Sequence, residues 1–228
     1  KKYKFFFVPM SSETINKLNS IQDNIDKLLN PSQKKPKIIC VSKTFSIDRL
    51  LPLINYGHIH FGENKVQEAI SKWTDIKQKN KGLQLHMVGK LQSNKVKKAL
   101  GIFDYIHSLD NHKLADVLKK NEIDQNKKLS YFIQVNIGDE KQKSGILPQD
   151  LKDFTKYCIN ENSLNVVGLM AIPPNDDKAK IYFEKLSIMN SDLGFSELSM
   201  GMSSDYLEAT KFKSSFLRIG SAILGARK

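Results

Sequence analysis

The chain has 228 residues, 26% of them charged and 40% hydrophobic, which is ordinary for a globular protein and enough for one domain with a large core. No apolar stretch approaches the roughly 20 residues that a membrane-spanning helix requires. The two cysteines, Cys40 and Cys158, are too few and too far apart for a disulfide scaffold or a metal site. We therefore expect a cytoplasmic protein with reduced thiols and no membrane association.

The net charge of +12 raises the question of nucleic-acid binding. Nearly all of the positive charge is lysine, because Arg49, Arg218 and Arg227 are the only arginines of the sequence. Lysine is the poorer residue for bidentate contacts to phosphates and bases, and the lysines are spread along the whole chain. We therefore predict no specific nucleic-acid interface, and a lysine-rich nucleic-acid-binding module remains an alternative.

In chain order, a basic and then apolar extension comes first, at residues 1–10, and we predict it to be disordered and outside the domain at 11–228. A helix is predicted at 13–29, and from residue 37 short apolar strands alternate with amphipathic segments. The predicted strands are 37–43, 58–62, 84–89, 105–108, 131–137, 166–172, 198–202 and 216–223. The predicted helices that follow them are 47–56, 65–77, 94–100, 113–121, 148–160, 177–193 and 205–213.

Single strands separated by single helices imply parallel pairing through right-handed crossovers. Eight such strands fit a closed barrel at the compact end of that fold's size range. An open doubly wound sheet would usually carry a glycine-rich dinucleotide-binding turn after its first strand, and residues 43–46 contain no glycine. The predicted fold is therefore α/β, a single (β/α)8 TIM barrel with an additional N-terminal helix.

Lys43 ends the first apolar strand, and in a barrel this position faces the reactive end, where the strands' carboxyl ends meet. Burial lowers the pKa of an ammonium group, and a partly deprotonated lysine is a nucleophile toward aldehydes. In a chain this rich in lysine, a solvated surface lysine is the alternative interpretation.

The loops after the seventh and eighth strands are the usual phosphate site of this fold. Gly201 and Ser203 lie in the first of these loops, and Gly220 and Ser221 lie in the second. Glycine lets the backbone approach an anion, and serine hydroxyls and free amides can donate to it. Arg218 falls within an apolar strand, where an unpaired guanidinium would be costly, so it should face a polar partner or a ligand. A nucleophilic lysine and a phosphate site on one barrel face together describe a site for pyridoxal 5′-phosphate.

Seven ordered segments of the sequence carry a resemblance to a known family. They are Val41-Ser42-Lys43-Thr44, Phe61-Gly62-Glu63-Asn64, His86-Met87-Val88-Gly89, Val135-Asn136, Gly168-Leu169-Met170-Ala171, Leu198-Ser199-Met200-Gly201 and Arg218-Ile219-Gly220. From about residue 12 onward the chain resembles the pyridoxal phosphate homeostasis proteins, whose barrel is related to the N-terminal domain of alanine racemase. The resemblance implies that pyridoxal 5′-phosphate is bound as an imine on Lys43. It also implies that Ser203, Gly220 and Ser221 bind the phosphate and that Arg218 lies against the pyridine nitrogen.

The same resemblance implies that Asn64 is a second-layer partner of the cofactor. His86, in the third strand, is predicted to be a structural residue of the barrel, and His58 and His60 lack a third ligand for a metal site. Two residues depart from the family pattern. Lys213 stands where a glycine is usual, and His60 stands where an acidic residue is common.

Three functions remain in competition. The first is a cofactor-binding protein that stores pyridoxal phosphate or delivers it to apo-enzymes, with little or no catalysis. The second is an amino-acid racemase of the alanine-racemase type, which needs a second acid–base group opposite Lys43. The sequence stops soon after the barrel, and no such group is evident. The nucleic-acid-binding module is the third, and we predict the first, as a monomer.

Overall fold

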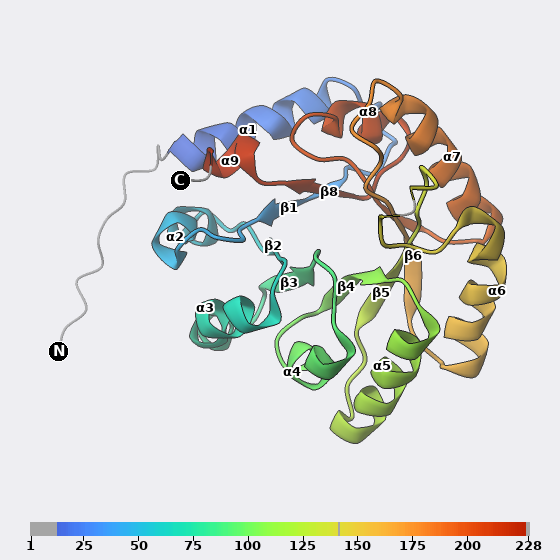
Figure 1. Ribbon diagram of the computed structural model, residues 1–228. Coiled ribbons are helices and arrows are strands. Elements are labelled where there is room, and N and C mark those ends of the chain that lie inside the picture. The colour runs from blue at the N-terminus through green and yellow to red at the C-terminus, as the bar shows by residue number, and fades with distance from the viewer. Residues whose placement is uncertain (1–12, 141, 227–228) are drawn as a thin grey trace.

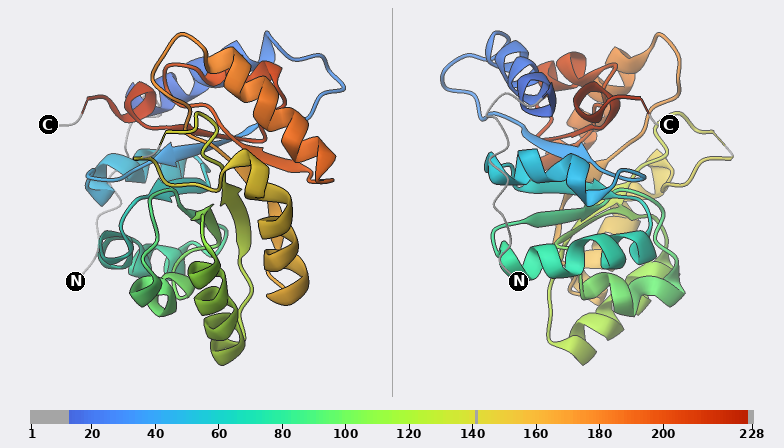
Figure 2. Two further views of the ribbon diagram at one scale, coloured as in Figure 1. Left: turned by 45° about the vertical axis from the view of Figure 1, so that its right-hand side comes forward. Right: turned by 90° about the vertical axis from the view of Figure 1, so that its left-hand side faces the viewer.

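The structure is a computed structural model that describes residues 13–140 and 142–226. The extension predicted at residues 1–10 lies outside these described residues. Eight parallel strands pair in chain order and close into a barrel, with β8 beside β1 and helices around the outside (Figures 1 and 2). The predicted (β/α)8 barrel with an additional N-terminal helix is therefore confirmed.

The strands are short and run parallel throughout. Their bounds are β1 Lys37–Val41, β2 His60–Glu63, β3 Gln84–Met87, β4 Tyr105–Leu109, β5 Ser130–Gln134, β6 Val166–Met170, β7 Glu197–Ser199 and β8 Phe216–Ile219. Several predicted strands were too long at their carboxyl ends, because apolar residues there continue into loops that cover the barrel mouth. In the eighth strand the chain turns at Gly220, and Ser221 begins the short helix α9, whose Ile223 and Leu224 are buried.

Helices cover the outer faces of the strands. The α-helices are α1 Glu13–Asp26, α2 Ile47–Asn55, α3 Val66–Lys79, α4 Val96–Leu100, α5 His112–Gln125, α6 Leu151–Lys156, α7 Ala179–Asp192, α8 Tyr206–Lys211 and α9 Ser221–Leu224. The 3-10 helices η1 Ser93–Lys95 and η2 Pro148–Asp150 precede α4 and α6, and the π-helix η3 Tyr157–Glu161 extends α6. Helix α1 lies beside α9 in Figure 1, which places the start of the described chain against its end.

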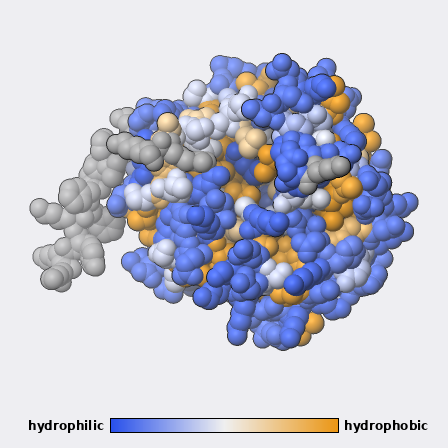
Figure 3. Space-filling model, in the orientation of Figure 1, coloured by the Kyte–Doolittle hydropathy of each residue, from blue (hydrophilic) through white to orange (hydrophobic). Residues whose placement is uncertain are grey.

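The apolar core has two parts, because strand side chains alternate between the two faces of the sheet. The larger part lies between the strands and the helices and includes Trp73, which is fully buried. The smaller part fills the inside of the barrel and is built from Ile39, Phe132, Met170 and Phe216. Hydrophilic residues dominate the face shown in Figure 3, with hydrophobic patches between them. Within the described ranges, no helix has both the length and the apolar character needed to cross a membrane.

Candidate functional site

A cavity of about 360 Å³ lies at the barrel end where the strands' carboxyl ends meet. Its walls come from the loops after β1, β3, β6, β7 and β8. The lining residues are Val41, Lys43, Val88, Ile172, Met202, Ser203, Ser204, Arg218, Gly220 and Ser221. The structure thus brings together five of the six predicted site residues, and the volume suits a small cofactor.

Lys43 follows the end of β1 and sits in a tight turn. The amide of Phe45 donates to the carbonyl oxygen of Ser42 at 3.1 Å and closes this turn. Thr44, its third residue, has a φ of 70°, in the left-handed region where glycine or asparagine usually stands. A β-branched residue in this conformation is strained, so the surrounding structure must hold the turn in place. Lys43 itself is half-buried at the cavity wall.

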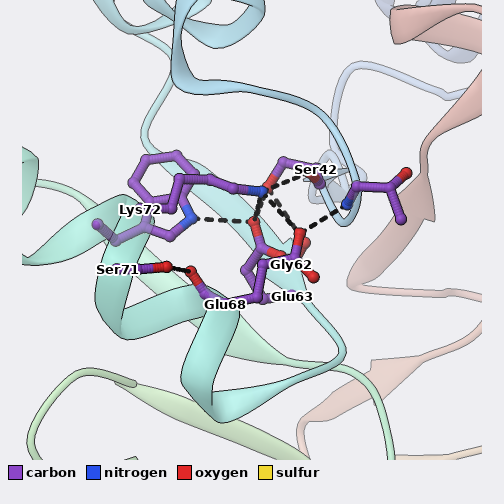
Figure 4. A network of polar contacts seen from close by, with 8 residues as sticks. Ser42, Gly62, Glu63, Glu68, Ser71 and Lys72 are labelled. Carbon is purple, nitrogen blue, oxygen red and sulfur yellow. Dashed lines mark hydrogen bonds and ion pairs between the residues drawn. The ribbon is translucent and has the colours of Figure 1, made fainter.

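A buried polar network lies directly behind this turn (Figure 4). The Oε1 atom of Glu63, at the end of β2, accepts hydrogen bonds from Ser42 Oγ at 2.7 Å, Lys72 Nζ at 2.9 Å and Trp73 Nε1 at 2.9 Å. Lys72 also donates to the Ser42 carbonyl oxygen at 2.9 Å and to Glu68 Oε1 at 3.1 Å. Glu63 is fully buried, and a buried carboxyl group requires hydrogen-bond donors of this kind. The sequence analysis missed this network, although a glutamate at the end of an apolar strand is a signal for a buried partner.

The loops after β7 and β8 meet at another part of the cavity wall. The amide of Ala222 donates to Ser203 Oγ at 3.3 Å, which joins the two loops. Gly201 has a φ of 89°, so the loop after β7 requires a glycine there. A Cβ on Gly220 would lie 3.2 Å from the carbonyl oxygen of Val41, so this residue lets the loop after β8 pass close to β1. Backbone amides and hydroxyl groups therefore gather at this wall, as an anion site requires.

Arg218 lies on β8, lines the same cavity and is 5% exposed. Its Nη1 donates to the carbonyl oxygen of Ser199 at 2.8 Å and to Ser199 Oγ at 2.7 Å, and its Nη2 donates to the carbonyl oxygen of Ala171 at 2.8 Å. These partners are neutral oxygens. Burial lowers the pKa of Arg218 to about 10, although the charge of Asp205 acts in the opposite direction. The guanidinium is therefore still charged at neutral pH and is oriented by three hydrogen bonds.

A chain of histidines continues from Ser199 through the inside of the barrel. The Ser199 hydroxyl lies 2.8 Å from His107 Nδ1, His107 Nε2 lies 2.9 Å from His86 Nδ1, and His86 Nε2 lies 3.0 Å from His60 Nδ1. Burial lowers the pKa of His86 and His107 well below the usual value, and that of His60 to about 4. All three imidazoles are therefore neutral at pH 7. His86 is structural, as predicted, but its partners His107 and Ser199 were not foreseen.

Asn64 is not among the residues that line the cavity of Lys43. It lines a hollow of about 400 Å³ together with Lys65 and Lys90, and within the described part of the chain its buried Oδ1 has no hydrogen-bond partner. His58, considered above for a metal, has its Nε2 2.9 Å from the carbonyl oxygen of His60. Across residues 13–140 and 142–226, no group of three or more histidine, cysteine, aspartate or glutamate side chains could hold a metal ion.

The fold and the site together define a (β/α)8 barrel with a lysine, an arginine and several serine hydroxyl groups at one cavity. The alanine racemase N-terminal domain family matches residues 17–228. The chain is 39% identical over 223 residues to the pyridoxal phosphate homeostasis protein of Pasteurella multocida (strain Pm70), covering 92% of this chain and 96% of that protein. It is 38% identical to the protein of the same name from Haemophilus influenzae, covering 92% and 94% of the two chains. The chain therefore belongs to the pyridoxal phosphate homeostasis protein family, as the resemblance predicted.

Solved structures agree with this assignment. The structure of PipY from Synechococcus elongatus PCC7942 with PLP bound has 31% sequence identity and a TM-score of 0.81, and the match covers 93% of this chain and 100% of that one. An alanine racemase from Clostridium difficile 630 has a TM-score of 0.68 at 14% identity. That match covers 92% of this chain and 56% of the racemase, and at this identity it shows a shared fold alone.

Proposed function

We propose that this protein holds pyridoxal 5′-phosphate as an imine on Lys43 and acts in intracellular vitamin B6 homeostasis, with little or no catalysis. The observation that carries the proposal is the cavity itself, which gathers a lysine, an oriented arginine and a wall of hydroxyl groups and backbone amides. The names of the relatives and the PLP bound to PipY support the same cofactor.

Each part of the cavity suits one part of the cofactor. Lys43 would supply the amine that condenses with the aldehyde carbon, so that a C=N bond forms and the carbonyl oxygen leaves as water. Ser203, Gly220 and Ser221 would donate to the phosphate oxygens. Arg218 would face the pyridine nitrogen, and because a guanidinium only donates, it would keep that nitrogen unprotonated. The bound cofactor would supply an electron-accepting ring, and this contact would make it a weaker acceptor.

The residues that line the cavity support binding of the cofactor rather than catalysis with it. Racemisation requires acid–base groups on both faces of the bound substrate. Among the described residues that line the cavity, Lys43 and Arg218 are the ionisable ones, and Arg218 is fixed by its hydrogen bonds to Ser199 and Ala171. A second acid–base group for racemisation would therefore have to come from outside these lining residues.

Borohydride reduction tests the cofactor site. The protein incubated with pyridoxal phosphate should absorb visible light, and borohydride should fix the cofactor on Lys43, identified by peptide mass. Lys43→Ala should abolish fixation, whereas Lys90→Ala, an exposed lysine at the same barrel end, should not. Fixation on another lysine, or the lack of an imine, would overturn the site.

Turnover and delivery need separate measurements. Incubation of the loaded protein with L-alanine should leave the optical rotation unchanged, and appreciable racemisation would establish the racemase alternative. If the protein delivers its cofactor, the loaded protein should restore the activity of a pyridoxal phosphate-dependent apo-enzyme faster than free cofactor does.

Light scattering checks the expected monomer. Both cysteines are free and buried, which is consistent with a reducing compartment and supports the cytoplasmic location that we propose.

A further inference from the structure

The backbone on both sides of Lys43 is held by side chains from a single helix, α3. The peptide group before Lys43 presents the Ser42 carbonyl oxygen, which accepts from Lys72 Nζ at 2.9 Å. The peptide group after Lys43 presents the Thr44 amide, which donates to Glu68 Oε1 at 2.7 Å. Glu68 and Lys72 are one helical turn apart and are themselves joined at 3.1 Å. The two residues therefore hold both peptide groups that flank Lys43.

This arrangement is anchored in the core. Lys72 is 9% exposed, and its ammonium also pairs with the fully buried Glu63 at 2.9 Å. Burial by itself would raise the pKa of Glu68, but the hydrogen bond from Thr44 and the charge of Lys72 outweigh it and lower that pKa. Glu68 is therefore ionised at neutral pH, and its Oε1 lies at hydrogen-bond distance from the Thr44 amide nitrogen.

The held turn is strained at Thr44, whose φ is 70°. A threonine relaxes out of this conformation unless an outside contact fixes it. The hydrogen bond from the Thr44 amide to Glu68 is a contact of this kind, because the strained residue itself donates it. The turn sets the direction in which the Lys43 side chain leaves the backbone, and a nucleophile must lie within roughly 3–3.5 Å of the carbon it attacks.

We propose that Glu68 is a positioning residue for Lys43: its carboxylate holds the left-handed turn at Thr44 and so directs the Lys43 amine into the cavity. This inference rests on the proposed function, since it concerns the reaction of Lys43 with an aldehyde. Glu68 acts through the backbone and lies behind the turn, on α3. It is not among the residues that line the cavity.

Two substitutions separate the reach of the Glu68 side chain from its charge, and a third, Glu68→Ala, removes both. Glu68→Gln keeps an acceptor oxygen at the same distance, and Lys72 keeps Glu63 as its charge partner. Glu68→Asp keeps the charge but shortens the side chain by one carbon, which withdraws the acceptor from Thr44. The control is Glu13→Ala on α1, because Glu13 also pairs with a lysine four residues away, Lys17.

The first readout needs no cofactor. Hydrogen exchange of the Thr44 amide, followed by NMR in the cofactor-free protein, should be about tenfold faster in Glu68→Asp and Glu68→Ala than in the parent. The second readout is the rate of imine formation with pyridoxal phosphate, fixed by borohydride and mapped to Lys43. It should fall by about tenfold in the same two variants, whereas Glu68→Gln and Glu13→Ala stay within about threefold of the parent.

Parent-like exchange and parent-like imine formation in Glu68→Asp and Glu68→Ala would overturn the proposal. The proposal would also be overturned if imine formation slowed in Glu68→Gln but not in Glu68→Asp. The charge of residue 68 would then matter, and the contact with Thr44 would not. Circular dichroism checks that each variant is folded. If Glu68→Ala does not fold, the comparison of Glu68→Asp with the parent decides the test. If the parent itself forms no imine at Lys43, the proposed function fails, and the exchange rate of Thr44 still decides whether Glu68 holds the turn.

Discussion

The Nη1 atom of Arg218 lies 2.7 Å from the hydroxyl oxygen of Ser199, and this contact gives the buried hydrogen bonds of the barrel a direction. A guanidinium only donates, so the Ser199 oxygen accepts from it. Among the described residues, the acceptor within reach of the Ser199 hydroxyl proton is His107 Nδ1. His107 then carries its own proton on Nε2 and donates to His86, and His86 donates in turn to His60.

Ser199→Ala should destabilise the protein by about 1–3 kcal/mol. The substitution leaves His107 Nδ1 without a donor and Arg218 Nη1 with the backbone carbonyl oxygen alone, both in the buried interior. Urea denaturation followed by the fluorescence of Trp73, the single tryptophan, measures the free energy of unfolding. Ser191→Ala, at an exposed position of α7, is the control and should change that free energy by less than about 0.5 kcal/mol. Equal effects of the two substitutions would contradict the hydrogen-bond chain.

Stability should fall as the pH is lowered from about 7.5 to about 5.5, because the buried histidines are neutral in the folded protein. Burial lowers the pKa of His58 and His60 to about 4, and that of His86 and His107 well below the usual value. In the unfolded chain these groups bind protons near pH 6.5, so the unfolded state takes up more protons across this range. Each buried histidine can contribute a slope of up to about 1.4 kcal/mol per pH unit.

Urea denaturation at the two pH values measures this effect. His60→Asn should flatten the dependence, since asparagine can still hydrogen-bond to His86 but does not titrate. An unfolding free energy that stays constant, or rises toward the lower pH, would show that the histidines are charged in the folded state. Glu68 and Glu197 do not confuse the result, because hydrogen bonds and neighbouring lysine charges lower the pKa of both carboxyl groups.

The barrel and most of the cavity could be predicted from the sequence for a general reason. In a parallel barrel the carboxyl ends of all strands meet at one end, so the position of a residue relative to its own strand determines its place in the fold. Lys43 and Ser203 could be placed in this way without knowing any side-chain contact. Arg218 was recognised because a charge within an apolar strand requires a polar partner.

The contacts around these residues could not be predicted in the same way. Glu68 meets Thr44 across 24 positions of the sequence, and His107 meets Ser199 across 92. Such contacts depend on the reach and rotation of individual side chains, which strand order does not specify. Asn64 lines a neighbouring hollow at the same end of the barrel, and its role as a second-layer partner of the cofactor stays a prediction.

Both cysteines should resist thiol reagents while the protein is folded. Burial, together with the charge of Asp116, raises the pKa of Cys158 to about 12, and burial with the charge of Glu63 raises that of Cys40 further. The reactive form of cysteine is the thiolate, so neither side chain is reactive near neutral pH. A colorimetric thiol reagent should label both cysteines in denaturing urea and neither in buffer. Rapid labelling of the native protein would place at least one thiol outside the core.

Lys213→Gly should stabilise the protein by about 1 kcal/mol, because the backbone at this position is left-handed. Lys213 is exposed, has a φ of 63°, and donates its amide to the carbonyl oxygen of Thr210 at 3.1 Å in the turn that ends α8. Glycine adopts this conformation without a steric penalty. The control is Lys185→Gly, at an exposed interior position of α7, which should cost about 1 kcal/mol because glycine weakens a helix. Opposite signs for the two lysine-to-glycine changes, measured by urea denaturation, would assign the effect to backbone conformation, since both remove the same side chain and the same charge.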